Sequence, residues 1–367
     1  MNNKYWLGLG LALVVPALVL AQTPTSAVKK TAVSAPATTN STTFKSFKAA
    51  FGAGDQAFKD QNWDEAAGDY AQAASLALND KSTSYALNAQ GWSLIKGKKW
   101  KSAQTVLEQA VKADGTNKTA ARNLGVASYR IYEFGFGGME DLKTAISNLE
   151  AGGDVDLLEL AKGAETREES YAQITPEAEP KLEGLNYKAL VALADKVQAQ
   201  GRFDLALKIF KKAGEVAHSA VSKGQAANLQ GKVLLDARRP HESIPYFEEA
   251  VKDQPNEKVY LNNLGYSYLE FYDAGKGDEE TLKKAVDAFY KANAIDPSFH
   301  KDNLVMALAE LKDVDPDAAK QYSASTEKTE EAAPDESAQG TSTPAAPTGL
   351  DAKPEKAEGA SQGKNSK

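Results

Sequence analysis

The stretch NLGVASYRIYEFGFGGMEDLKTA runs from Asn123 to Ala145, and the related stretch NLGYSYLEFYDAGKGDEETLKKA runs from Asn263 to Ala285. Their numbering differs by a constant offset of 140, because 263 − 123 = 140. Between 123–149 and 263–289, ten of the 27 aligned positions are identical, which is well above chance. We infer a tandem duplication, so any role given to the glycines of FGFGG must also suit AGKGD.

A pattern of small and large residues recurs six times between about residues 47 and 297. In each unit a first helix carries one small residue. A second helix carries a small, a large and a small residue at i, i+4 and i+7, which lie on one helix face. A glycine inside a helix costs about 0.5–1 kcal/mol, so its recurrence predicts closely packed helix pairs. The first-helix residues are Gly54, Gly91, Gly125, Ala194, Gly231 and Gly265, and the second-helix triads are Ala66–Tyr70–Ala73, Ala103–Leu107–Ala110, Ala145–Leu149–Gly152, Ala206–Phe210–Ala213, Ser243–Phe247–Ala250 and Ala285–Phe289–Ala292.

These residues resemble the tetratricopeptide repeat, whose unit is a helix–turn–helix of about 34 residues. The matches to its consensus, in order, are Gly91, Leu94, Trp100, Ala103, Leu107 and Ala110, and again Gly231, Leu234, Ser243, Phe247, Ala250 and Pro255. Pro240 stands where two units carry Trp63 and Trp100, which predicts that a helix starts there. The resemblance implies an all-α solenoid of helix–turn–helix repeats with the first helices on its concave face.

The spacing of the small residues divides the units into two blocks of three. Gly54, Gly91 and Gly125 follow one another at intervals of 37 and then 34, and the second block repeats both intervals. In the third unit of each block, the interval from the first-helix to the second-helix small residue is 20, whereas it is 12 in the shorter units. We predict an elongated hairpin in which each helix gains about one turn, near 5 Å, with the glycines at its tip.

A phosphate-binding loop is the alternative interpretation of FGFGG. It requires a preceding strand, and none is predicted. The acidic residues after each tip suit the positive start of a helix and would repel phosphate. Two hypotheses stay open for Phe134 and Phe136 at the first tip: they dock on the opposite block or a partner, or they are buried against the local capping helix.

The predicted organisation has six segments. MNNK followed by an apolar run from Tyr5 to Ala21 is typical of a secretory signal peptide. An uncleaved anchor is the alternative, but the run is short for a span and contains Gly8, Gly10 and Pro16. The segments are a signal peptide (1–21), a Thr/Ser/Ala/Pro tether (22–43), block one with a trailing helix (44–172), a hinge (173–186), block two with a capping helix (187–322) and an acidic low-complexity tail (323–367). Whether the blocks stack into one superhelix is left open.

Composition excludes several kinds of chemistry. The chain has no cysteine, so disulfides, thiol catalysis and thiolate metal sites are ruled out. A net charge of −7 argues against nucleic-acid binding. His218, His241 and His300 lack partners at metal spacing, and no phosphate loop or nucleophile motif is present. We predict no catalytic residue, no cofactor and no metal site, and therefore a protein that is not an enzyme.

The predicted partner-binding residues lie on the first helices, on the face that the resemblance implies to be concave. They are Tyr85, Asn88, Trp92, Arg122, Tyr129, Asn228, Asn262 and Tyr266, with Val126 and Lys232 on the same face. Asparagine offers a donor and an acceptor to a peptide backbone, and Tyr and Trp are typical interface anchors. The alternative is that the aromatic residues pack between helices and the asparagines bond within the array.

The favoured function is a non-catalytic interaction scaffold of the bacterial periplasm or cell envelope, binding peptide or helical segments of protein partners. After signal cleavage, no membrane insertion is expected. The alternative function is a self-associating structural protein of the envelope, in which the blocks pack on one another or on a second chain as a homo-oligomer.

The signal-peptide interpretation predicts that the mature chain begins at Gln22, because cleavage follows Val19-Leu20-Ala21. Mass spectrometry of the protein from its native cell checks this. A chain that starts at Met1 would contradict it.

Overall fold

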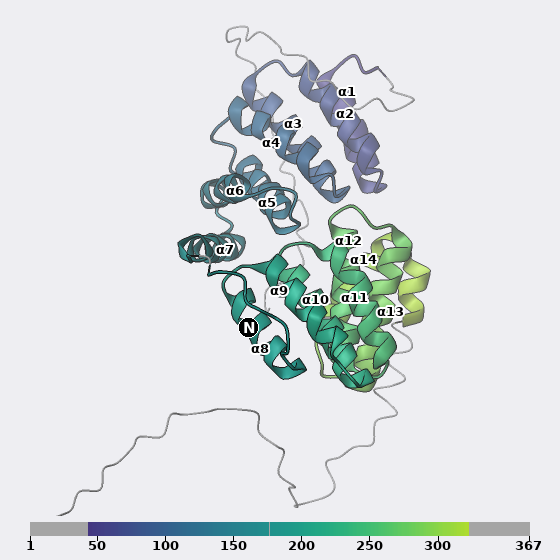
Figure 1. The fold of residues 1–367 in the computed structure, drawn as a ribbon. Helices are drawn as coiled ribbons and strands as arrows, with labels where there is room; N and C mark the ends of the chain where they lie inside the picture. Colours follow the sequence, from purple (N-terminus) through teal and green to yellow (C-terminus); the bar gives the residue numbers. More distant parts are fainter. Residues whose placement is uncertain (1–42, 176, 323–367) are drawn as a thin grey trace, which may run out of the picture. The chain divides into compact units, whose positions relative to one another are not determined.

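The computed structural model describes residues 43–175 and 177–322. The predicted signal peptide, nearly all of the tether and the tail lie outside the described residues. The described chain is α-helical and contains no β-strand, which confirms the predicted fold class (Figure 1). Its helices, in order, are α1 (Phe47–Lys59), α2 (Trp63–Leu76), α3 (Asp80–Lys96), α4 (Trp100–Ala113), α5 (Lys118–Glu133), α6 (Met139–Gly152), α7 (Val155–Gln173), α8 (Tyr187–Ala199), α9 (Phe203–Glu215), α10 (Ala220–Asp236), α11 (Pro240–Asp253), α12 (Lys258–Asp273), α13 (Glu279–Ile295) and α14 (Lys301–Val314).

Consecutive helices pack against one another, and these contacts include the six predicted pairs, α1/α2, α3/α4, α5/α6, α8/α9, α10/α11 and α12/α13. The helices α7 and α14 each pack on the pair before them. Leu304 and Leu311 of α14 are buried, as expected for a helix that caps the array. No helix forms in the described residues between α7 and α8, where the hinge was predicted.

The small residues on the first helices bring each pair together. A Cβ added to Gly54 or Gly265 would lie 2.8 Å from the ring of Tyr70 or Phe289, and one added to Gly231 would lie 2.6 Å from Phe247. Gly91 meets Leu107, and Gly125 meets Leu149, in the same way. Every one of these large side chains is buried. The predicted packing of a large residue over a small one is confirmed.

Local signals fix where the helices begin. Side-chain oxygens of Ser46, Asn79, Asn117, Asn186 and Ser219 accept hydrogen bonds from the first turns of α1, α3, α5, α8 and α10. Pro240 is the first residue of α11, as predicted, at a position where its missing N–H costs no helical hydrogen bond.

The third and sixth units form the predicted elongated hairpins. The helix α3 ends at Lys96, five residues beyond Gly91, whereas α5 ends at Glu133, eight residues beyond Gly125. The start of α6 precedes Ala145 by six residues, whereas the start of α4 precedes Ala103 by three. Each helix therefore gains three residues, close to one turn. Gly135 and Gly275 occupy the left-handed region at the two tips, with φ of 71° and 72°.

Two glycines of α1 provide a matched test of the packing. We expect Gly54→Ala to destabilise the fold by about 1–3 kcal/mol, because the added methyl group overlaps Tyr70. Gly52→Ala should stabilise it by about 0.5–1 kcal/mol, because nothing lies within 4 Å and alanine favours the helix. Urea denaturation measures both, and effects of the same sign would contradict the packing role of Gly54.

Candidate functional site

The three asparagines predicted to bind a partner are bonded inside the array. The Oδ1 atom of Asn88 accepts a hydrogen bond from Nδ2 of Asn123 at 2.9 Å, and that of Asn228 accepts one from Asn263 at 2.8 Å. Oδ1 of Asn262 accepts from Asn303 at 3.0 Å. All three predicted residues are at most 8% exposed. The bonds of Asn88 and Asn228 join neighbouring first helices, and the bond of Asn262 joins α12 to α14. The assignment of these asparagines as partner-binding residues stays a prediction.

Several other predicted residues also serve the array. Arg122 is half-buried, and its Nε donates to Asp154 at 2.8 Å. Tyr129 is only 8% exposed and lies against Tyr132, while Val126 is buried. Trp92 is half-buried and packs on the core of block one. Lys232 is exposed. The burial of Tyr129 and Val126 agrees with the alternative that they pack within the array.

Tyr85 belongs to a stack of three aromatic rings that was not predicted from the sequence. It is 40% exposed, and its ring lies parallel to that of Phe51 with centroids 5.0 Å apart. Phe51 in turn stacks on Phe47 at 5.5 Å. The three rings come from the first helices α1 and α3. Phe47 and Phe51 are four residues apart in α1, a spacing that could have identified them.

The duplication shows that this ring stack is peculiar to block one. At the offset of the duplication, the positions equivalent to Phe47, Phe51 and Tyr85 carry Tyr187, Val191 and Gln225. There the hydroxyl of Tyr187 donates to Oε1 of Gln225 at 3.1 Å. Block two therefore has a polar bond where block one has three stacked rings.

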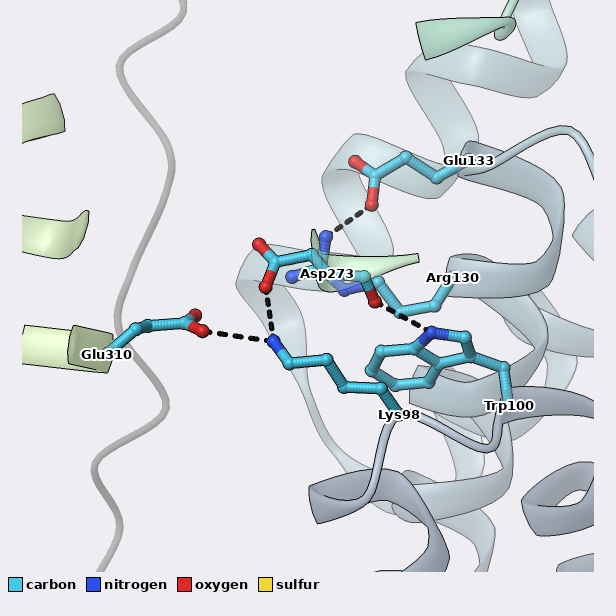
Figure 2. Close-up of polar contacts among 6 residues, drawn as sticks. All are labelled: Lys98, Trp100, Arg130, Glu133, Asp273 and Glu310. Atoms are coloured by element: carbon cyan, nitrogen blue, oxygen red, sulfur yellow. Dashed lines mark hydrogen bonds and ion pairs between the residues drawn. The ribbon is translucent and has the colours of Figure 1, made fainter. Parts of the chain in front are cut away.

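A polar cluster lies where the two blocks meet (Figure 2). Lys98, in the turn between α3 and α4, bonds the carboxylate of Asp273 at the end of α12 and Oε2 of Glu310 in α14, the latter at 2.9 Å. The indole N–H of Trp100 donates to the backbone carbonyl of Asp273 at 2.9 Å. In the same figure Arg130 bonds Glu133 of its own helix. These side chains come from both blocks, which settles that the blocks touch.

Burial controls the protonation of this cluster. Burial acts to lower the pKa of Lys98, but the carboxylates of Asp273 and Glu310 outweigh it and hold that pKa above its usual value. Burial raises the pKa of Glu270 to about 8, and Glu133 and Asp273 raise it further, against Arg130 and a hydrogen bond from Tyr266. Burial also raises the pKa of Glu310. Because carboxylates outnumber the cations here, their repulsion adds to burial in favouring the protonated form of Glu270.

Two features are absent from the described residues, 43–175 and 177–322. No group of His, Asp and Glu side chains there is arranged to hold a metal ion. No described helix is both long and apolar enough to cross a membrane.

Residues 228–298 match the family model described as Tetratricopeptide repeat. The matched segment runs from within α10 through α13 and into the turn after it, and the other helix pairs repeat its helix–turn–helix arrangement. A comparison with curated protein sequences finds no match.

Several solved structures are similar to this chain. MamA of MSR-1 is 20% identical, with 58% of this chain and 97% of that chain covered, at a TM-score of 0.25. YrrB, described as a TPR protein with an unusual peptide-binding site, is 18% identical, with coverage of 69% and 97% and a TM-score of 0.28. The TPR2AB domain of yeast Sti1 in a complex with pHSP90 is 16% identical, with coverage of 71% and 97% and a TM-score of 0.27.

The raised pKa of Glu270 predicts a pH-dependent stability. The folded protein keeps the proton on Glu270 up to about pH 8, whereas an ordinary glutamate has a pKa of 4.5. The folded state therefore binds more protons in this window, so the free energy of unfolding falls as pH rises from about 4.5 to about 8.

Glu270→Gln keeps a neutral side chain of similar shape and should remove this contribution. We expect the variant to match the wild type near pH 4 and to be more stable at pH 8 by on the order of 1–4 kcal/mol. Urea denaturation across this range measures the difference, with the exposed Glu108→Gln of α4 as control. A wild type and Glu270→Gln with parallel pH profiles would contradict the role given to burial.

Proposed function

We propose that this protein is a non-catalytic interaction scaffold that binds a peptide or helical segment of a protein partner along the first helices of block one. The observation that carries the proposal is the stack of Phe47, Phe51 and Tyr85, in which aromatic rings are partly exposed on adjacent first helices.

An exposed ring stack suits an apolar side chain of a partner. Rings that are already stacked lose little conformational entropy on binding, and Tyr is enriched among residues that dominate binding energy. The Tyr85 ring offers an apolar face beside a hydroxyl group, so it can contact both the side chain and the backbone of a bound segment. We do not include Asn88 and Asn228 in this binding surface, because their side-chain oxygens accept hydrogen bonds within the array.

The partner is a protein, and the setting that we propose is the bacterial periplasm or cell envelope. The apolar segment 5–21 supports export, and the net charge of −7 disfavours nucleic acid. A helical repeat without a catalytic motif in its sequence favours a binding role over an enzymatic one.

The second candidate function is a self-associating structural protein. The contact between the two blocks of one chain favours this function in the form in which the blocks pack on each other. Light scattering of the purified mature chain separates this form from a homo-oligomer. A monomer at high concentration would remove the oligomer, and a dimer would favour it.

Site-specific photo-crosslinking tests the binding surface. A photoreactive phenylalanine at position 85 should capture a protein in the native cell, whereas the same residue at the equivalent position 225 should not. Tyr85→Ala should weaken binding of the captured protein by about tenfold or more, as expected for an aromatic anchor worth over about 1.4 kcal/mol. Gln225→Ala is the matched control. Equal capture at 85 and 225, or unchanged binding by Tyr85→Ala, would contradict the proposal.

A further inference from the structure

Short turns join the first and second helices of units one, two, four and five, and each turn has one residue with left-handed backbone. These residues are Gln61, Lys98, Gly201 and Arg238, with φ of 60°, 56°, 71° and 58°. The turns of Lys98 and Arg238 contact the hairpin tip of the opposite block. A Cβ added to Gly275 would lie 2.6 Å from the carbonyl oxygen of Lys98, and one added to Gly135 would overlap that of Arg238.

The side chains of these two turns bind the same kind of helix end. The ammonium of Lys98 lies 4.2 Å from the centre of the Tyr272 ring, and the guanidinium of Arg238 lies 4.0 Å from that of Tyr132. Arg238 also donates to the carbonyl oxygen of Tyr132 at 2.8 Å. Tyr132 and Tyr272 are equivalent under the duplication and lie in the last turns of α5 and α12.

The turn of unit four contacts the helix that follows block one. A Cβ added to Gly201 would lie 2.6 Å from the ring of Tyr171 in α7. Phe203 meets the same ring edge to face, with ring centroids 5.7 Å apart. Three of the four short turns are therefore covered by a tip or a helix from elsewhere in the chain.

The turn of unit one differs from the other three. Gln61, Asn62 and Asp64 are exposed. Asp64 pairs with Lys99 of the neighbouring turn at 2.7 Å. Among the described residues, no hydrogen bond, ion pair or ring contact joins this turn to a hairpin tip or to block two.

Trp63 has the same place in this turn as Trp100 has in the turn of unit two, because each follows the left-handed residue by two positions. The indole N–H of Trp100 donates to the backbone carbonyl of Asp273, the last residue of α12, at 2.9 Å (Figure 2). The indole N–H of Trp63 has no hydrogen-bond partner among the described residues. Unit one therefore has the donor but lacks the helix end that the donor binds in unit two.

An open groove of about 490 Å³ lies beside Trp63. It is lined by Asn62, Trp63, Asp64, Glu65, Gly97 and Lys99. Gly97 caps the C-terminus of α3, as Phe134 caps that of α5. The ring of Phe134 lies 5.8 Å from that of Trp100, whereas Gly97 has no side chain and leaves space beside Trp63.

We propose that the turn of unit one, with Trp63 and the groove beside it, binds the C-terminal end of a helix in a partner protein, one that ends in a left-handed glycine as the two hairpin tips do. The last carbonyl groups of a helix have no helical donor, and the Trp63 N–H can supply one. The ammonium of Lys96 lies 5.6 Å from the centre of the Trp63 ring, where a cation favours the negative end of a helix. Both tips of this chain already occupy other turns, so the helix end comes from another protein.

This surface is continuous with the contact between the blocks and separate from the ring stack. Lys99 and Trp100 follow Lys98 directly, and Lys99 joins the turns of units one and two through Asp64. The ring stack lies in the first halves of α1 and α3, whereas the turns follow the ends of these helices. This proposal therefore does not depend on what binds the ring stack.

The indole N–H signals of the whole chain test the site. Of the four tryptophans, Trp6 lies in the predicted signal peptide, so a chain that begins at Gln22 keeps Trp63, Trp92 and Trp100. The probe is a helix-stapled peptide with the sequence of residues 264–278, which contains the end of α12 and its tip. Titrated into the ¹⁵N-labelled chain, it should shift the Trp63 signal to saturation. The signals of Trp92 and Trp100 should stay in place, because the chain's own tip holds Trp100.

Anisotropy of the fluorescently labelled peptide measures the effect of substitutions. Trp63→Phe keeps an aromatic ring but removes the donor, and it should weaken binding by about threefold to tenfold, as expected for one hydrogen bond. Trp92→Phe is the matched control and should leave the affinity unchanged. In the peptide, Gly275→Val should weaken binding by about tenfold or more, because valine resists the left-handed backbone of the tip.

A shift at Trp92 or Trp100 without one at Trp63 would overturn the assignment of the site, as would a dissociation constant above about 1 mM. Unchanged binding by Trp63→Phe, or by the Gly275→Val peptide, would overturn the way in which the helix end is held. Light scattering tests the choice of partner. A dimer that becomes a monomer in Trp63→Phe would make a second copy of the chain the occupant in place of another protein.

Discussion

The contact between a small first-helix residue and a large second-helix residue sets the geometry on which the rest of this structure depends. Gly91 under Leu107 and Gly231 under Phe247 leave no space for even one methyl group. Each glycine lowers the stability of its helix by about 0.5–1 kcal/mol relative to alanine. The van der Waals contacts made by the closely packed helices must offset this cost. Because the same contact recurs in each unit, successive pairs stack with similar geometry. The binding surface and the interface between the blocks both follow from that regularity.

Duplication of the block created a surface that meets its own copy. The third unit of each block is longer by three residues in each helix, which carries the tip to the turn of the other block. The turn residues Lys98 and Arg238 adopt left-handed backbone, which costs a non-glycine residue on the order of 1–2 kcal/mol. Gln61 adopts the same conformation in the first unit, so the short turn itself imposes it. Lys98 and Arg238 add the long cationic side chains that reach the opposite block.

The two copies differ in chemistry at several positions where they face each other. Arg130 of block one has Glu270 as its equivalent in block two, and the Phe136 ring lies beneath the ammonium of Lys276. Trp100 donates to the Asp273 carbonyl, whereas its equivalent Pro240 starts a helix and has no such donor. The contact between the blocks therefore has different chemistry on its two sides. Burial at this contact, together with the neighbouring carboxylates of Glu133 and Asp273, raises the pKa of Glu270.

The sequence by itself determined the repeat fold, the helix pairs, the elongated hairpins and the start of α11 at Pro240. These features depend on local periodicity, residue size and backbone preference, which are properties of neighbouring residues. The same local information could not tell whether Asn88 faces a partner or Asn123, because both positions satisfy the helical pattern. Local information also could not predict that Phe134 is buried against Trp100. Nor could it predict that Phe47 and Phe51 form one ring stack with Tyr85. Only the tertiary structure decided the surroundings of these residues and the contact between the blocks. The side chains involved lie far apart in the sequence, and their charges interact strongly only when folding buries them close together.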